Sequence, residues 1–253
     1  LKPGQSPHGF QMTPADMKRL ASSDLLVWVG TPVDLWMKKA KNSIGVNALA
    51  MHDLKGLVEY PVRQGGVWEK HDHRAHETEK DHAAEHEGHG HDNPDEHNHR
   101  DEHEHETGEN HALRMDGHLW MSVENAILLV KEVSQVLQGL SPGEAEQIAL
   151  REQQWLAKLQ KTDLKVKEQL QPVAQVPYMV LHDAFQYFEK RYQLNGVGSI
   201  QLNPAVSPSL KRVKELRDKI AAGDVQCVFK EPQFPKNKVC LLYTSPSPRD
   251  LGK

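Results

Sequence analysis

The sequence predicts an α/β protein with two lobes, whose mainly parallel sheets are joined by one long linker helix. Short apolar runs alternate with amphipathic helical patterns along most of the chain, an order that is typical of parallel strands connected by helical crossovers. Residues 144–171 contain neither Gly nor Pro, so a single helix about 42 Å long can form there and bridge two lobes. A length of 253 residues is enough for two lobes that each bury a core.

The first lobe is expected to cover residues 1–143. Its first helix begins at a capping-box pattern, in which Thr13 caps the helix and Asp16 faces the cap. Residues 25–29 are a short apolar run followed by a glycine, and they predict a buried strand. Further helices are expected at 34–41 and at 123–137, where apolar residues recur at i, i+3, i+4 and i+7.

The long helix at 144–171 and the second lobe follow. Ser141 and Glu144 form a second capping box before this helix, and Pro172 ends it. A buried strand at 176–181 then brings His182 to its C-terminal end. The second lobe is expected at 172–239 and to be incomplete. One of its helices is expected to run through Phe185, Tyr187, Phe188 and Tyr192, and a strand is expected at 225–229. Between them a helix capped by Ser207-Pro208 is expected, with inward-facing residues Leu210, Val213, Leu216 and Ile220.

Residues 69–111 have a composition unlike the rest of the chain. They hold 15 Asp or Glu against four Lys or Arg, a net charge of −11, and no aromatic residue. Such a segment cannot bury enough apolar surface to offset the entropy of ordering, so it is expected to be a disordered loop. Its repeated His-x-His spacings among acids indicate metal binding at low affinity, and the alternative is a solvated acidic linker without a metal role. The histidines concerned are His71, His73, His76, His82, His86, His89, His91, His97, His99, His103, His105 and His111.

Three isolated histidines are candidate metal ligands. His8, His118 and His182 each come just before a predicted helix, at the edge of an α/β sheet where ligands bind. Three neutral imidazoles with one open position suit Zn²⁺, whereas Mn²⁺, Mg²⁺ and Ca²⁺ prefer carboxylate oxygens. From the residues alone, three unrelated surface or capping histidines remain the alternative. His52 is expected to have no metal role.

Other functional classes find little support. No run approaches 18 consecutive apolar residues, which excludes a membrane span within this sequence. The net charge is −4 and no basic patch is visible, so nucleic-acid binding is not expected. The motifs HExxH, GxSxG and Walker A are absent, and 196–198 supply only two glycines of a dinucleotide motif. Aromatic residues at core-like spacing are Trp28, Trp36, Trp120, Trp155, Tyr178, Phe185, Tyr187 and Phe188.

Five motifs together resemble a known family. They are Pro3-Gly-x-x-Pro7-His8, the run from Thr13 to Leu20, Asp116-Gly-His118, His182-Asp-Ala-Phe and Glu231-Pro-Gln-Phe234. In this order they resemble the cluster A-I periplasmic metal-binding proteins of ABC importers, and most of all the high-affinity zinc-uptake type, the ZnuA type. The resemblance covers about residues 1–239 and includes a His/Asp/Glu-rich insertion between the first two ligand regions.

The resemblance implies a site and a fold. In that family two α/β lobes joined by one long helix grip the metal between them. The family's ligands carry over to His8 and His118 in the first lobe and to His182 in the second, with Asp183 and Glu231 as candidate supporting carboxylates. Histidine at the third position marks the zinc type, since manganese relatives have a carboxylate there. The fourth ligand is expected to be water or a carboxylate beyond this sequence.

The resemblance also implies a function and a place in the cell. The chain is expected to capture Zn²⁺ in the periplasm as a monomer and to deliver it to an ABC-importer permease and its ATPase, with a periplasmic metallochaperone as a further candidate partner, and without catalysing a reaction. A signal peptide and further C-terminal strands, including a cysteine partner for Cys227, are expected to be missing from this sequence. Residues 240–253 match nothing in the family and are expected to be a non-native tail that includes Cys240.

Three other functions remain open from the sequence. A zinc hydrolase also uses three histidines and an open position, and Asp183 and Glu231 are then the nearest candidate general bases. A metal buffering or storage protein would depend on the loop at 69–111. The third is manganese import by the same scaffold, which His182 disfavours because Mn²⁺ prefers a carboxylate ligand.

Overall fold

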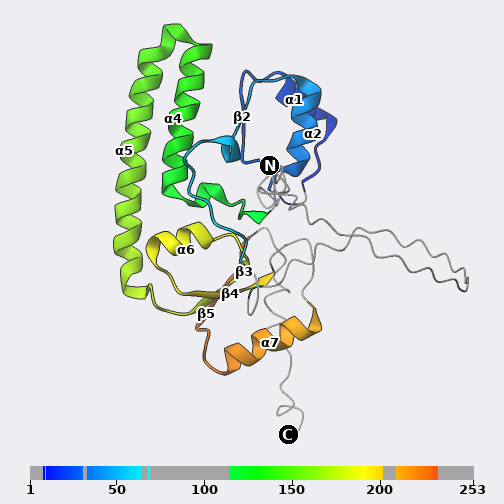
Figure 1. The fold of residues 1–253 in the computed structure, drawn as a ribbon, viewed down its shortest axis with the longest axis vertical. Coiled ribbons are helices and arrows are strands. Elements are labelled where there is room, and N and C mark those ends of the chain that lie inside the picture. The colour runs from blue at the N-terminus through cyan, green and yellow to red at the C-terminus, as the bar shows by residue number, and fades with distance from the viewer. Residues whose placement is uncertain are drawn as a thin grey trace, which may run out of the picture.

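The computed structural model describes residues 8, 10–30, 33–63, 68, 114–201 and 209–232. Within these ranges the predicted α/β class, with parallel sheets in two lobes and one long helix, is confirmed. Figure 1 shows the first sheet with α1 and α2 on one side, the pair α4 and α5, and the second sheet below. The twelve histidines at 71–111, the predicted cap Ser207-Pro208 and the segment 240–253 lie outside the described residues.

The first sheet has two short parallel strands in the described residues. β1 (Leu26–Trp28) pairs with β2 (Ala48–Ala50), and α2 (Leu35–Ile44) connects them. Leu26, Trp28, Met37, Ala40 and Ala50 form the buried core of this lobe. α1 (Pro14–Ala21) begins at the predicted capping box, in which Thr13 and Asp16 hydrogen-bond to each other reciprocally.

The long helix lies beside a second helix. α4 (Val123–Leu140) and α5 (Ala145–Leu170) run antiparallel and side by side (Figure 1), and the 26 residues of α5 span about 39 Å. The predicted capping box at Ser141 is wrong, because the Ser141 side chain makes no capping hydrogen bond. A single 3₁₀ turn at Pro142–Glu144 separates the two helices instead, and its tighter winding takes Ser141 away from the first turn of α5.

The second sheet is fully parallel in the described residues. β3 (Tyr178–His182) lies between β4 (Gly196–Gln201) and β5 (Cys227–Phe229), and His182 ends β3 as predicted. β4 was not predicted, because its two glycines resemble turn residues. One of them serves packing: a Cβ at Gly196 would overlap the carboxylate of Glu189.

The helices of the second lobe are α6 (Gln186–Tyr192) and α7 (Leu210–Ala221). α7 is capped by Ser209, whose hydroxyl accepts a hydrogen bond from the Arg212 amide. Val213 and Leu216 are buried as predicted, but Leu210 is 90% exposed. The prediction for Leu210 is wrong because it is the first helical residue, and its side chain points back beyond the helix start.

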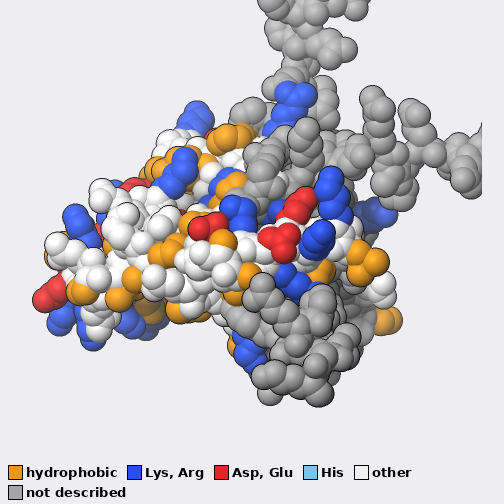
Figure 2. All heavy atoms as spheres, turned by 90° about the horizontal axis from the view of Figure 1, so that it is seen from below, with side chains coloured by type: hydrophobic (Ala, Val, Ile, Leu, Met, Phe, Trp, Pro, Cys, Tyr) orange, Lys and Arg blue, Asp and Glu red, His pale blue; other side chains and the backbone are white. Residues whose placement is uncertain are grey.

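Some side chains predicted to lie in the core are exposed in the structure. Trp120 is 40% exposed and Trp155 is 53% exposed, so their predicted core positions are wrong. Cys227 is exposed and forms no disulfide within the part of the chain that the structure describes. Lys and Arg side chains are spread over the face seen in Figure 2, with Asp and Glu side chains between them. No described helix is both long and apolar enough to cross a membrane.

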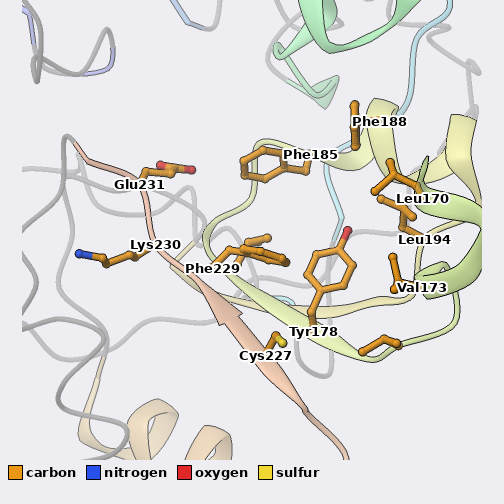
Figure 3. Close-up of a pocket in the computed structure, with 12 residues that line it drawn as sticks. Leu170, Val173, Tyr178, Phe185, Phe188, Leu194, Cys227, Phe229, Lys230 and Glu231 are labelled. Carbon is orange, nitrogen blue, oxygen red and sulfur yellow. The ribbon is translucent and has the colours of Figure 1, made fainter. Parts of the chain in front are cut away.

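A largely apolar cavity of about 530 Å³ lies between the end of α5, the sheet strands β3 and β5, and α6. Phe185, Phe188, Tyr178 and Phe229 line much of it (Figure 3), while Glu231 lies at one end. The three candidate histidines are not among its lining residues.

One aromatic residue of the second lobe is buried in the first. Tyr187 of α6 is 2% exposed and packs with Met51 and Leu119, which belong to the first lobe. Its hydroxyl donates a 2.7 Å hydrogen bond to the carbonyl of Asp116. The two lobes therefore share a small apolar core directly beside the segment that carries His118.

Gly30 is predicted to be irreplaceable. Its φ is +106°, and an added Cβ would overlap the ring of His52. Gly30→Ala should therefore lower the free energy of unfolding by about 3 kcal/mol, from backbone strain together with overpacking. Gly45→Ala is the matched control, because Gly45 also has positive φ (+63°) but open space around it, and it should cost only about 1 kcal/mol. Equal urea midpoints for the two variants would contradict this packing.

Candidate metal centre

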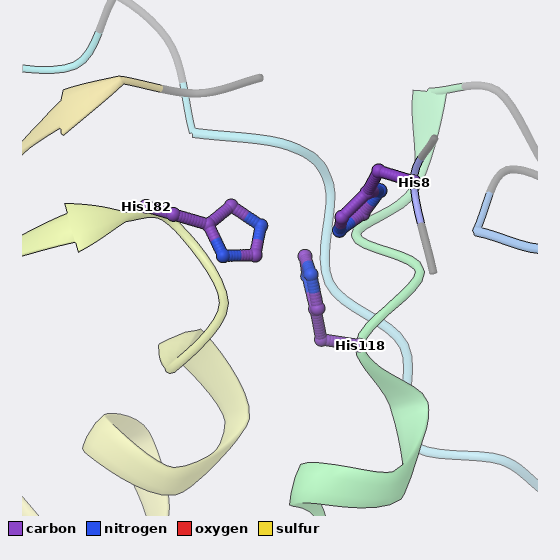
Figure 4. Close-up of side chains that lie close together, drawn as sticks. All are labelled: His8, His118 and His182. Atoms are coloured by element: carbon purple, nitrogen blue, oxygen red, sulfur yellow. The ribbon is translucent and has the colours of Figure 1, made fainter. Parts of the chain in front are cut away.

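Three histidines from distant parts of the chain meet at one point. His182 ends β3, His118 precedes the 3₁₀ turn Leu119–Met121, and His8 lies before α1. Figure 4 shows their rings turned toward a common centre between the second sheet and the start of α4. The ring centroids of His182 lie 4.9 Å from those of both His8 and His118, which are 5.5 Å from each other.

The dimensions suit a metal ion. One nitrogen of each ring can be chosen so that all three lie within 4.8 Å of one another. Tetrahedral zinc with nitrogen ligands at about 2.0–2.1 Å places them about 3.3 Å apart, so a small inward movement would bring the three nitrogens to binding distance of one ion. His118 and His182 are only 7% and 4% exposed. Among the described residues, Nε2 of His118 is buried without a hydrogen-bond partner, as expected for a nitrogen awaiting a ligand.

Asp116 orients His118. Its Oδ1 accepts from the His118 backbone amide at 3.0 Å and lies 2.6 Å from Nδ1 of the same ring. Nε2 is then the nitrogen left to face the centre. Asp116 was recognised from the sequence only as part of a family motif, and its role in orienting His118 was not predicted. The Asp-Gly-His spacing that allows both contacts is nevertheless visible in the sequence.

The side chain of Gln186 supports Asp116 from the second lobe. With its amide in the orientation that satisfies both of its ends, it donates to Asp116 Oδ2 at 3.0 Å and to the carbonyl of Pro61 at 3.2 Å. Both oxygens of the Asp116 carboxylate are thus engaged, one by each lobe.

The two carboxylates singled out from the sequence have different surroundings. Both oxygens of Glu231 lie 3.4 Å from Nδ1 of His182, so Glu231 stands where a supporting carboxylate is expected. The Asp183 carboxylate, the other candidate supporting group, forms an ion pair with Arg63. Asp183 lies just after the end of β3, and its carboxylate is held by Arg63 rather than by the ring of His182.

Burial keeps His8 uncharged. Desolvation, with the neighbouring His182 and His118 next in size, lowers the pKa of His8 to about 3, and Asp116 opposes the shift. A neutral imidazole offers a lone pair to a cation without first losing a proton. His52 lies apart from this cluster, with Nε2 3.1 Å from Asp53 and its ring beside Trp28.

Comparison with known proteins identifies the family. A model of the family described as "Zinc-uptake complex component A periplasmic", or ZnuA, matches residues 1–242. The chain belongs to the ZnuA family. A relative in Brucella abortus, named high-affinity zinc uptake system protein ZnuA, is 32% identical over 231 residues, which are 90% of this chain and 68% of that protein. Members of the ZnuA family are periplasmic components of zinc-uptake complexes.

Solved structures show the same fold. A crystal structure of ZnuA superposes with a TM-score of 0.68 at 18% identity and covers 96% of this chain and 76% of that one. The periplasmic zinc binding protein TroA from Treponema pallidum gives a TM-score of 0.66 at 21% identity, over 96% of this chain and 72% of that one. The ZnuA family fold therefore holds for this chain across both lobes.

The lowered pKa of His8 predicts a pH effect on the metal-free protein. Because the folded pKa is about 3 and the unfolded pKa about 6.5, the unfolded chain alone gains a proton on His8 between these values, and stability falls as the pH drops. Other groups titrate too, so urea midpoints of the wild type and His8→Gln are compared at pH 7, 6 and 5. The wild type should lose roughly 1 kcal/mol more per pH unit below 6.5 than the variant. Parallel pH profiles would contradict the burial of a neutral His8.

Proposed function

We propose that this chain captures Zn²⁺ through His8, His118 and His182, between its two lobes, and delivers it to a membrane importer without chemical change. The observation that carries the proposal is the convergence of three buried or half-buried imidazoles from both lobes. The relatives named as high-affinity zinc uptake proteins support zinc as the cargo.

The chemistry of the donors favours zinc over harder ions. All three candidate ligands are imidazole nitrogens, which a borderline-soft d¹⁰ ion accepts in tetrahedral geometry. Manganese and magnesium would be better served by a carboxylate in place of His182. The open fourth position would be taken by water or another oxygen ligand.

The family supports part of this proposal on partners and location. The proposal includes an ABC-importer permease and its ATPase as the recipient, the periplasm as the compartment, and a monomeric chain that can accept zinc from a metallochaperone. The description of the family as a periplasmic component of a zinc-uptake complex supports the first two.

The surroundings of the cluster argue against a hydrolase. A catalytic zinc site needs a general base poised at the bound water. Glu231 is held beside Nδ1 of His182, and Asp183 is paired with Arg63. Asp183 is therefore occupied by Arg63, and Glu231 is placed to support His182 rather than to act as a base.

Zinc calorimetry at neutral pH tests the proposal. The chain without residues 71–111 should bind one ion tightly, because the cluster lies wholly outside that segment. His118→Ala should weaken this site at least about 100-fold, since one of three ligands is lost. His52→Ala is the control and should leave the affinity unchanged, because His52 lies apart from the cluster.

Two outcomes would overturn the proposal. If the folded, shortened chain has no tight site, metal binding belongs to the His-rich segment and the protein is a buffer or store. If the zinc-loaded chain turns over simple esters and loses this activity in His118→Ala, it is a hydrolase.

Asp116→Asn is expected to weaken zinc binding while leaving all three histidines in place. The side-chain oxygen of asparagine can still accept a hydrogen bond from the backbone N–H of His118, but it carries no full negative charge to stabilise the ring proton on Nδ1. The zinc dissociation constant should rise about 10-fold, as measured by chelator competition. An unchanged constant would mean that Asp116 serves only the local turn.

A further inference from the structure

Arg63 joins the two lobes next to the candidate metal site. It belongs to the first lobe, yet its guanidinium pairs with Asp183 and Glu189 of the second. Nε donates to Asp183 Oδ2 at 3.1 Å, one terminal nitrogen pairs with Asp183 Oδ1, and the other pairs with Glu189. The ring of Trp68 lies 3.6 Å from the guanidinium carbon and covers it.

This arrangement is buried and fully engaged. The side chains of Arg63, Asp183 and Glu189 are 17%, 6% and 4% exposed. The hydroxyl of Tyr178 donates to the second oxygen of Glu189 at 3.0 Å. Burial raises the pKa of Glu189, and the charge of Arg63 opposes that rise. Removing the guanidinium would leave two carboxylates buried close together, so this contact fixes the position of its partners firmly.

Arg63 is connected to the candidate metal ligands of both lobes, through its partner Asp183 in the second lobe and through its own backbone segment in the first. Asp183 directly follows His182. In the first lobe, the segment just before Arg63 is hydrogen-bonded to the segment that leads to His118: the amide of Val62 donates to the Arg114 carbonyl at 2.9 Å, and the amide of Asp116 donates to the Tyr60 carbonyl at 2.8 Å. An isolated antiparallel bridge between Pro61 and Met115 lies between these two bonds.

A short, continuous chain of contacts therefore connects the ligands of the two lobes. We propose that Arg63 is a positioning residue for the metal site: by binding Asp183 and Glu189 from the segment that is bridged to Met115 and Asp116, it sets the distance and direction of His182 relative to His118. This inference rests on the proposed function, because it concerns the geometry of that same site. The fork of Arg63 is essential to it, since a single ammonium cannot bind two carboxylates in fixed planar geometry.

The chain provides a matched control in Arg191. This arginine of α6 also pairs with two carboxylates, Asp163 of α5 and Glu124 of α4, and the Tyr192 hydroxyl donates to Asp163 at 2.8 Å. Like Arg63 it binds two carboxylates, and it joins α6 to α4 and α5, but it adjoins no candidate metal ligand. A role in folding alone would make the two arginines equivalent.

The test compares Arg63→Lys and Arg191→Lys in the full chain with the wild type. Three quantities are measured: thermal midpoint, zinc dissociation constant by chelator competition, and the visible absorption spectrum with one equivalent of Co²⁺. Arg63→Lys should weaken zinc binding about 10-fold and change the Co²⁺ spectrum, because the ligand geometry is altered. Arg191→Lys should lower the thermal midpoint while leaving both metal measurements unchanged.

The outcomes separate this inference from the proposed function. A wild type without a tight zinc site would overturn the proposed function itself. A tight wild-type site that Arg63→Lys leaves unchanged in affinity and spectrum would overturn the positioning role alone. Equal losses of affinity in both variants would also overturn it, since they would reflect stability rather than geometry.

Discussion

The candidate site depends on one constraint: three imidazoles from segments far apart in the sequence must be held within a few ångströms of each other. No local structure can do this, because His8, His118 and His182 belong to different elements of two lobes. The shared core around Tyr187 meets the constraint by burying a side chain of α6 against Met51 and Leu119 of the first lobe. The site is thus a product of the contact between lobes rather than of either lobe alone.

The sequence predicted those parts of the fold that local pattern determines. The capping box at Thr13, the helix now seen at Val123–Leu140, the long helix and the strand ending at His182 all follow from periodicity and end signals within a few residues. It failed where two signals compete. Ser141 and Glu144 match the capping-box pattern, but a 3₁₀ turn forms between them and the α-helix, and the capping hydrogen bond is absent. β4 was missed because it contains glycines, one of which is needed for packing.

The same limit applies to the site. His8, His118 and His182 could be named from their positions before helices and from a family resemblance, and the structure brings these three together. The partners that orient them were harder to foresee. Asp116 could have been inferred from the Asp-Gly-His spacing. Arg63 and Gln186 contact residues more than 60 positions away, and only the packing of α6 and β3 reveals those contacts. Long-range ion pairs leave no periodic trace in one sequence.

Tyr187 gives the interface between the lobes a mechanical property. Its hydroxyl bonds the carbonyl of Asp116, and the carboxylate of that same residue holds the ring of His118. Separating α6 from the first lobe would therefore pull on the residue that aligns a ligand. In the proposed site, parting the lobes at Tyr187 would therefore also disturb the ring of His118, so the rate at which this interface breaks would set how long an ion stays bound.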